Sequence, residues 1–506
     1  MSESRVMNEC KTENGALSLA STGSARVDLF FKLVRNIPKD TLCNLIQASW
    51  YEDPLDTMKI LFHSRDCRGG KGDRLPFLLG MQYIIAQYPE WFLANFKQIS
   101  IYGRWLDYVE LYKSDFCKPR IQDVIMTHLV ETLQKDIDAM TTWQNVSLLA
   151  KWIPGEGKKW DRVHNFTDNL CVKLFKLRDV TKVNSWHHMQ LRKQYLTPLR
   201  QKIKIVETQM CENKWPEIEY SSVPGVAMTN LNKAFKRHDN ERFLKYLDDV
   251  KNKRNGAKIN ADVVYPHTIV EKYLEEYNTH GVGTFINDVY EMQWKAIEDK
   301  ITLEDTVVVS DVSGSMSGTP MMVSIALGIL LATKNKSAAF KDQLITFDDD
   351  PRFTYIGDCE SLLHKIIKVS KMPWGGSTNL QRTFDIILAK CLFKMEAVPK
   401  KLIIFSDMQF NLAIGGSQRV SMLNFDAIRN KFEAHNLTMP EIIFWNLRGD
   451  TGDFPVSSDV PGVTLLSGFS PTLLNSIMTG VTLTPYDILR QILDNPRYSD
   501  IVAPIN

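Results

Sequence analysis

The chain has 506 residues, of which 44% are hydrophobic and 24% charged, and its formal net charge is +2. This length exceeds one ordinary core and predicts two to four domains at roughly 100–200 residues per domain. The composition is typical of a globular protein, and no apolar run approaches the ~18–20 residues of a membrane span, which argues against a membrane protein.

Residues 1–25 are expected to form a disordered tail, because they are small and polar and contain no apolar segment typical of a secretory signal. The eight cysteines include no CxxC pair, which argues against a zinc ribbon and against a disulfide scaffold. Reduced thiols are typical of the cytosol. We therefore expect a cytoplasmic protein or, if the source is viral, one packaged in a virus particle.

From residue 26 to 298 the sequence indicates a succession of helices. Apolar residues recur at three- and four-residue spacing in segments such as 75–88, 119–135 and 241–250, and Pro, Gly, Asp and Asn separate the segments. A long helical region has to pack helix on helix, and stacked antiparallel pairs are the usual solution. We expect an all-α, HEAT-like solenoid over residues 26–298.

The pattern changes at about residue 299. Short apolar runs rich in β-branched residues alternate with helical stretches, and these runs occupy 306–313, 343–347, 401–407, 441–447 and 463–468. Strands that are apolar on both faces and alternate with helices form mostly parallel sheets. We expect an α/β doubly wound domain over residues 299–506, with an antiparallel edge strand after Asp350 and a ligand site at the carboxyl ends of the strands.

Three loops at this edge carry oxygen-bearing side chains. The first strand leads into Asp311, Ser313 and Ser315. A later strand ends in Asp407, and Thr378 opens a helix between them. Carboxylate and hydroxyl oxygens suit a hard cation, and Mg²⁺ prefers six oxygen ligands in near-octahedral geometry. The sequence therefore predicts a Mg²⁺ site built from these five residues.

The DxSxS motif, followed in order by the threonine and the aspartate, resembles the metal-ion-dependent adhesion site of von Willebrand factor A domains. In that family the two serines bind the ion directly, while the threonine and the aspartates bind it directly or through water. The resemblance implies the same roles here, with a divalent cation as cofactor and an open coordination position for a partner's carboxylate. Ser377 leaves open which hydroxyl of its loop reaches the ion. A polar loop that binds no ion is the alternative.

The first part of the chain is mildly basic, with 43 Lys and Arg against 38 Asp and Glu in residues 1–300. Segment 63–74 (HSRDCRGGKGDR) lies between two predicted helices, and its glycines exclude regular helix. Four cations of this glycine-rich loop are expected to contact phosphate together with backbone N–H groups. They are Arg65, Arg68, Lys71 and Arg74. The alternative is a solvated loop whose two aspartates pair with its own arginines.

Other cations of this part lie near aromatic residues, as in RNA-binding surfaces where aromatic rings stack on unpaired bases. These candidates are Arg104, Lys158, Lys159, Arg192, Lys193, Arg237 and His238. For any single cluster a solvated helix face is the commoner explanation. The neighbouring tryptophans are expected to anchor the core rather than to stack on bases, and they are Trp105, Trp152, Trp186 and Trp215.

The order of the two regions resembles proteins with a TROVE module (telomerase, Ro and vault proteins), and more closely a family of eukaryotes and large DNA viruses that pairs a TROVE-like region with an A domain. HSRDCRGGKGDR, YGRWLDYVEL and VPGVAMTNLNKAFKRHDNERFLKYL are among the stretches that carry this resemblance. In Ro-type relatives the helical repeats form a ring closed by the A domain. Small structured RNA lies on its basic outer surface, and single-stranded ends enter the central hole.

The resemblance implies a non-enzymatic, ribonucleoprotein-type protein that binds structured or single-stranded RNA. The alternative is a protein-interaction scaffold whose A domain binds a partner carboxylate through the metal, without RNA. An enzyme is the least favoured class, because no nucleophile–base pair or paired-carboxylate set has a usable spacing.

Overall fold

The fold is that of a computed structural model, which describes residues 9–11, 17–142, 144–158, 161, 165–281, 285–301, 303, 305–346, 351–372, 380–394, 397–409, 425–450, 453–476 and 483–505. The chain divides into two compact units. The sheet unit comprises Met1–Pro76, Pro224–Lys236 and Glu241–Ser499, and the helical unit comprises Phe77–Val223, Arg237–Asn240 and Asp500–Asn506. None of the helices in the described ranges is both long and apolar enough to cross a bilayer.

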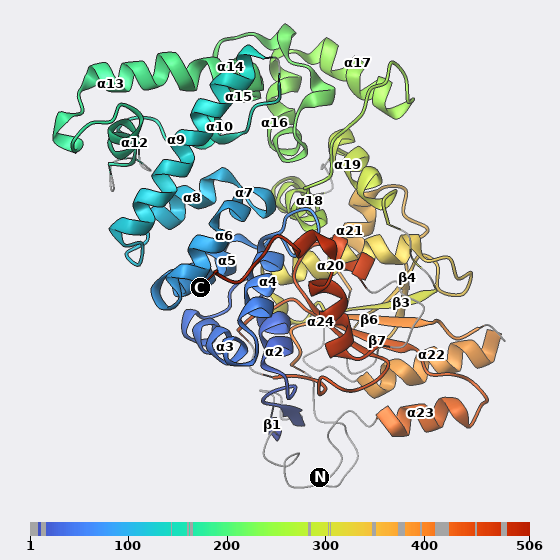
Figure 1. The fold of residues 1–506 in the computed structure, drawn as a ribbon. Coiled ribbons are helices and arrows are strands. Elements are labelled where there is room, and N and C mark those ends of the chain that lie inside the picture. The colour runs from blue at the N-terminus through green and yellow to red at the C-terminus, as the bar shows by residue number, and fades with distance from the viewer. Residues whose placement is uncertain are drawn as a thin grey trace. The chain divides into compact units, whose positions relative to one another are not determined.

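The sheet unit is built on six strands in the order β5-β4-β3-β6-β7-β8, of which Figure 1 labels β4, β3, β6 and β7. They are β3 (Thr306–Ser310), β4 (Gln343–Thr346), β5 (Phe353–Tyr355), β6 (Lys401–Ser406), β7 (Glu441–Asn446) and β8 (Val463–Ser467). All neighbouring pairs are parallel except β4–β5, which confirms the mostly parallel sheet and its antiparallel edge strand. Every residue of β3, β6 and β8 is buried, as expected for strands covered on both faces.

Helices from both halves of the sequence cover this sheet. On one side α20 (Thr319–Lys334) packs against β3 and α18 (Pro266–His280) packs against α20. At the β8 end, α2 (Ala25–Lys32) and α24 (Pro485–Leu493) both contact that strand. The boundary expected between residues 298 and 299 therefore does not coincide with the division into units, because helices from the first half share the core of the sheet.

The other helices that lie wholly or mainly in the sheet unit are α3 (Lys39–Glu52), α4 (Pro54–Arg65), α16 (Gly225–His238), α17 (Asn240–Lys251), α19 (Asp288–Glu298), α21 (Leu362–Ser370), α22 (Leu380–Lys394) and α23 (Phe425–Glu433). Short 3-10 turns occupy Gly314–Met316, Pro471–Ser476 and Pro496–Tyr498.

Part of the tail that was expected to be disordered is ordered. β1 (Glu9–Lys11) and β2 (Leu17–Leu19) form an antiparallel pair, and the backbones of Leu19 and Phe454 exchange two hydrogen bonds of 2.9 Å. Farther along, the Thr22 N–H donates to Asp28 at 2.8 Å. Residues 17–25 thus belong to the sheet unit.

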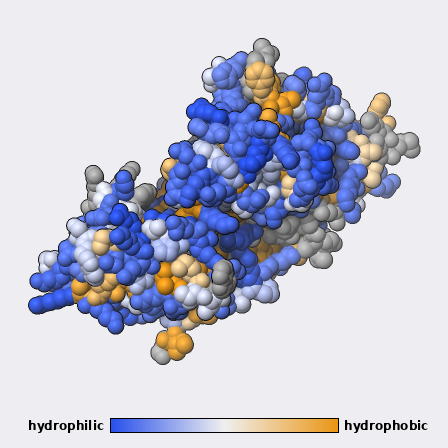
Figure 2. Space-filling model, turned by 90° about the horizontal axis from the view of Figure 1, so that it is seen from above, coloured by the Kyte–Doolittle hydropathy of each residue, from blue (hydrophilic) through white to orange (hydrophobic). Residues whose placement is uncertain are grey.

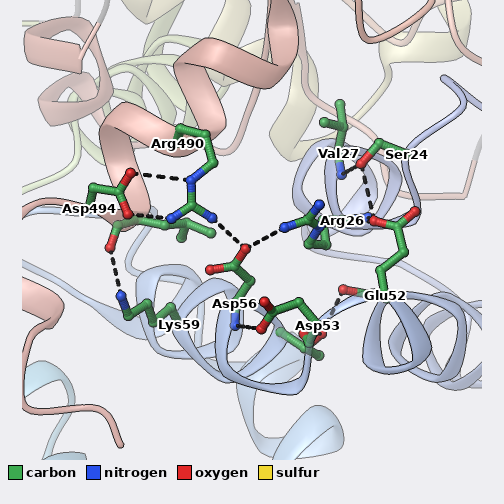
Figure 3. Close-up of polar contacts among 12 residues, drawn as sticks. Ser24, Arg26, Val27, Glu52, Asp53, Asp56, Lys59, Arg490 and Asp494 are labelled. Atoms are coloured by element: carbon green, nitrogen blue, oxygen red, sulfur yellow. Dashed lines mark hydrogen bonds and ion pairs between the residues drawn. The ribbon is translucent and has the colours of Figure 1, made fainter.

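An ion-pair network joins the first and last helices of the sheet unit (Figure 3). The buried carboxylate of Asp56 in α4 accepts hydrogen bonds from Arg26 of α2, at 2.7 Å, and from Arg490 of α24. Each arginine has a second carboxylate, Glu52 for Arg26 and Asp494 for Arg490. Since a buried charge is costly without a partner, this shared carboxylate ties α2, α4 and α24 to one another.

The helical unit contains only helices and loops in the ranges described for it. Its helices are α5 (Arg74–Gln87), α6 (Pro89–Asn95), α7 (Ile99–Tyr102), α8 (Trp105–Tyr112), α9 (Pro119–Thr141), α10 (Leu149–Trp152), α12 (Phe166–Leu174), α13 (Ser185–Gln190), α14 (Thr197–Ile203) and α15 (Val206–Cys211), with a π-helical segment at Leu191–Leu196. Short 3-10 turns occupy Phe96–Gln98, Val180–Lys182, Trp215–Glu217 and Tyr220–Ser222. The long α9 contacts α8, α10, α12 and α14. A mostly helical region before the sheet is thereby confirmed.

Candidate metal centre

The neighbouring parallel strands β3 and β6 bring two carboxylates to one edge of the sheet. Their pairing ends at Ser310 opposite Phe405, and the Asp311 N–H donates to the Phe405 carbonyl at 3.0 Å. Asp311 follows β3 directly, and Asp407 follows β6 directly. The structure therefore places these two sequence-predicted residues together at the carboxyl ends of the strands.

The loop after β3 turns tightly and presents two hydroxyl groups. The Ser313 N–H donates to Asp311 Oδ1 at 2.9 Å, and the hydroxyl oxygens of Ser313 and Ser315 lie 2.9 Å apart. Ser313 is buried, whereas Ser315 at the outer end of the loop is exposed. The Asp311 carboxylate is thus held by the backbone of the loop, and the two hydroxyls lie within hydrogen-bonding distance of each other, with access from solvent on the Ser315 side.

Asp311 is fully buried beside a second acid. Its Oδ2 accepts a hydrogen bond from the Ser406 hydroxyl at 3.0 Å. Burial, and after it the negative charge of Asp407, raises the pKa of Asp311 to about 6. A cation bound between the two acids would favour the charged form and relieve their repulsion.

Asp407 is 1% exposed, and only one of its carboxylate oxygens accepts a hydrogen bond from a described residue. Oδ1 accepts from the Gln409 N–H at 3.1 Å. Oδ2 receives no hydrogen bond from the described part of the chain, and Arg448 Nη1 lies 3.9 Å from it. A buried carboxylate oxygen without a donor is costly unless a ligand satisfies it, so Oδ2 is suited to binding a cation.

Arg448 is a participant that the sequence analysis did not predict. It follows β7, the strand next to β6, and its Nη1 donates to the Ser315 carbonyl at 2.6 Å. Its Nε and Nη2 donate to the two carboxylate oxygens of Asp450. The signal that could have found it is its position, because a residue that follows a strand adjacent to β6 reaches the same edge of the sheet.

Thr378 and Ser377 lie outside the described residues, so the third loop of the predicted site is not placed. In the described ranges no three His, Cys, Asp or Glu side chains gather to hold a metal. The site at this edge has a different donor set of two carboxylates with hydroxyls, which suits Mg²⁺ because this ion is commonly held by one or two carboxylates and completes its shell with water.

The glycine-rich loop differs from both sequence interpretations. Lys71 is fully buried, and its Nζ donates to the Phe30 and Leu33 carbonyls and to the Ser467 hydroxyl. Arg65 is also buried, at 2% exposure. These two cations are therefore not presented to a phosphate, while Arg68 is exposed and Arg74 is half-buried at the start of α5.

The aspartates of this loop pair with arginines from elsewhere in the sheet unit. Asp66 accepts hydrogen bonds from Arg497, at 2.7 Å for one of the two contacts, and Asp73 accepts one from Arg35 at 2.7 Å. Gly70 is required by packing, since a Cβ there would collide with the His63 carbonyl. The loop is a packed element that joins α2, α4 and β8.

The remaining predicted cations belong to the helical unit and are mostly solvent-accessible. The exposed ones are Arg104, Lys158, Arg192, Lys193, Arg237 and His238, whereas Lys159 lies outside the described residues. His238 stacks on Trp215 with ring centroids 4.5 Å apart. Trp186 is 54% exposed, so its expected role as a core anchor is wrong. The visible face of the molecule in Figure 2 is mainly hydrophilic, with scattered apolar residues.

Comparison with known proteins gives the class of the chain. The family described as "Domain of unknown function (DUF2828)" matches residues 12–111 and 105–306, which together exceed half of the chain. The chain therefore belongs to this family. A second description, "Domain of unknown function (DUF7788)", matches residues 305–490, the part that holds the sheet.

A full-length relative comes from a giant virus. The chain is similar to "Uncharacterized protein L728" of Acanthamoeba polyphaga mimivirus, with 28% identity over 522 residues. The match covers 96% of this chain and 87% of the viral protein. The helical part and the sheet part therefore occur together in one viral chain.

Proposed function

We propose that the sheet part is a von Willebrand factor A-like domain that binds Mg²⁺ and, through the ion, an acidic group of a partner protein. The observation that carries the proposal is Asp407 Oδ2, a buried carboxylate oxygen that no described residue hydrogen-bonds, beside the buried Asp311. Such a pair is destabilised by its own repulsion, and a dication between the two acids would remove that cost.

The residues that would hold the ion are Asp311, Ser313, Ser315 and Asp407, joined by Thr378 or Ser377 from the third loop. Two carboxylates and neutral hydroxyls would leave a dication coordinatively unsaturated, so that water or a partner's carboxylate could complete its shell. The exposed Ser315 lies at the solvent side, where such a partner would approach. The function proposed is binding of a partner protein without catalysis, since the described surroundings of Asp311 and Asp407 supply no evident general base.

Calorimetric titration of the chelator-treated full chain with Mg²⁺ and Mn²⁺ tests this proposal. One binding site is expected in the wild type and none in Asp311→Asn. Asp358→Asn is the matched control, because it removes an exposed carboxylate of the same unit that pairs with Lys368. Unchanged titration curves for Asp311→Asn would contradict the proposal.

A second function, RNA binding by the helical unit, is favoured by the exposed Trp186 and by two exposed cations that follow it in consecutive helical segments. Trp186 precedes Arg192 and Lys193 by less than two helical turns, and its ring lies 6.1 Å from that of Phe175. An exposed aromatic ring near arginine and lysine is suited to stack on an unpaired base while the cations contact phosphate. The TROVE-like resemblance, with its HEAT-like solenoid and ribonucleoprotein role, is part of this second proposal.

Filter binding of a single-stranded RNA across a salt series tests the RNA proposal. Affinity should fall steeply with salt, and the triple variant Trp186→Ala, Arg192→Gln, Lys193→Gln should bind at least tenfold more weakly. The matched control is Arg120→Gln, an exposed arginine of the same unit that pairs with Glu90. Absence of binding at low salt would contradict this function.

A further inference from the structure

Arg448 is held in a fixed position at the candidate metal centre. The Leu447 N–H donates to the Ser406 carbonyl at 3.1 Å, and the Arg448 N–H donates to Asn446 Oδ1 at 2.9 Å. The next residue, Gly449, lies so close to the turn after α2 that a Cβ would be 2.9 Å from the Val34 carbonyl oxygen. The backbone before Arg448 is therefore held by hydrogen bonds, and the backbone after it is closely packed. Both restrict the position from which the Arg448 side chain extends toward the site.

The guanidinium contacts the elements that supply the predicted ligands. Nη1 donates to the Ser315 carbonyl at 2.6 Å and lies 3.9 Å from Asp407 Oδ2. Asp450 fixes its orientation through two hydrogen bonds, one from Nε at 2.9 Å and one from Nη2. A dication held by Asp407 and the Ser315 hydroxyl would therefore be the close neighbour of a fixed positive charge.

We propose that Arg448 is a cationic latch that sets the metal affinity of this site. The inference rests on the proposed metal-binding function and concerns its regulation. Arg448 and the dication would compete for the same buried carboxylate, Asp407, and like charges a few ångströms apart repel more strongly beside a partly buried site than in bulk water. The latch keeps metal affinity low until a negatively charged partner group supplies the compensating charge.

The latch also connects the metal to the position of the β3 loop. When the dication binds, the ion pair between Arg448 and Asp407 should weaken. Because Arg448 also hydrogen-bonds the Ser315 carbonyl, a shift of Arg448 would move the residue whose hydroxyl is a proposed ligand. By thermodynamic reciprocity, any change that loosens Arg448 strengthens metal binding by the same factor by which metal binding loosens Arg448. Arg448 is thus a positioning residue for the site and not one of its ligands.

Metal titration of the full chain by calorimetry, with Mn²⁺ and Mg²⁺ in turn, tests the latch. Arg448→Gln should bind metal about tenfold more tightly than the wild type, because a fixed like charge has been removed. Arg448→Lys, which keeps the charge, should stay within about threefold of the wild type. Arg429→Gln is the matched control, since it removes an exposed arginine of the same unit and should leave the affinity unchanged.

The outcomes separate the latch from the metal site itself. Equal or weaker metal binding by Arg448→Gln, with normal binding by the wild type, would overturn the latch and leave the metal site standing. Binding by Arg448→Gln alone would support a latch strong enough to exclude the ion from the wild type. Absence of binding in both would overturn both ideas. Circular dichroism checks folding, and Arg448→Met replaces the glutamine variant if that variant does not fold.

Discussion

Two regions of the sheet unit bury charge in different ways. In the glycine-rich loop, the buried acids are paired with opposite charges from other segments of the same unit, Asp66 with Arg497 and Asp73 with Arg35, although Asp73 Oδ2 also has no hydrogen-bond donor among the described residues. At the carboxyl edge of the sheet, Asp311 and Asp407 are equally buried, yet they are like charges and Asp407 Oδ2 has no hydrogen-bond donor among the described residues. Buried acids that are paired with an opposite charge indicate a structural role, whereas two buried acids placed side by side indicate a ligand site.

The largest effect is expected at Lys71. Lys71→Met should lower the free energy of unfolding by about 3–5 kcal/mol, because removal of one partner leaves buried polar groups unsatisfied. Urea unfolding followed by tryptophan fluorescence measures the change. A loss below about 1 kcal/mol would mean that the loop does not depend on its buried lysine as the structure indicates.

The contribution of the glycine-rich loop to stability should also depend on pH, because His63 is buried there. Burial, and then the positive charge of Lys71, lowers the pKa of His63 from 6.5 to about 3. The unfolded chain therefore binds a proton between these values that the folded protein does not, so stability is fully present above pH 6.5 and is lost as the pH falls toward 3. His267, with its pKa lowered to about 3 mainly by burial, acts in the same direction.

His63→Leu should reduce this slope by at most one proton, which is about 1.4 kcal/mol per pH unit. Urea titrations at several pH values between 4.5 and 7.5 measure it. Parallel stability curves for the wild type and His63→Leu would show that this imidazole is not held neutral by the fold.

At the candidate metal centre, stability should depend on pH with the opposite sign. The raised pKa of Asp311, about 6, means that the folded protein keeps a proton which the unfolded chain has lost. In the presence of chelator, stability from this group is greatest below pH 4 and falls as the pH rises through 6. Asp311→Asn should therefore stabilise the protein by about 1 kcal/mol at pH 7 in chelator, and it should lose the stabilisation that Mg²⁺ gives to the wild type.

Thermal unfolding of the wild type and Asp311→Asn, each with EDTA and with Mg²⁺, checks this result. If Asp311→Asn is instead less stable than the wild type by several kcal/mol in EDTA, Asp311 stabilises the fold itself. It would then not differ in role from the buried acids of the glycine-rich loop.

The smallest effect is expected at Arg68, the exposed cation of the glycine-rich loop. Arg68→Ala should change the free energy of unfolding by less than about 0.5 kcal/mol, since substitutions of exposed side chains are usually nearly neutral and ion pairs at the surface contribute little. It serves as the control for Lys71→Met in the same urea experiment. A large effect would mean that the exposed part of the loop also carries structural contacts.

Sequence patterns predicted the sheet because its strands are short and apolar on both faces and alternate with helices. They also predicted that Asp311 and Asp407 end strands at the same edge. What no pattern could supply is the neighbour relation, since β4 separates β3 from β6 in sequence but not in the sheet. Arg448 was not predicted as part of the site, because its role depends on β7 lying next to β6 and on the position of the Ser315 carbonyl.

The glycine-rich loop shows where local reasoning fails. Glycines and cations between two helices are typical of an exposed loop, so Lys71 was predicted to face solvent. Its partners are Phe30, Leu33 and Ser467, and the last is 396 positions away in the sequence. Burial of a lysine by such distant acceptors leaves no local signature. Trp186 is the converse case, a large apolar residue that the fold leaves exposed.

The sheet unit is assembled from three separate stretches of the chain, with the helical unit inserted after Pro76. During synthesis, the apolar face of α2 therefore stays exposed until β8 and α24 have left the ribosome. Folding that depends on such contacts between distant parts of the sequence is slow, and the exposed surface is prone to aggregation. A fragment that ends near residue 298 would lack Phe454, whose ring lies 5.8 Å from that of the buried Phe31. The two family matches, which meet at residues 305–306, accordingly cover stretches whose helices and strands share one core.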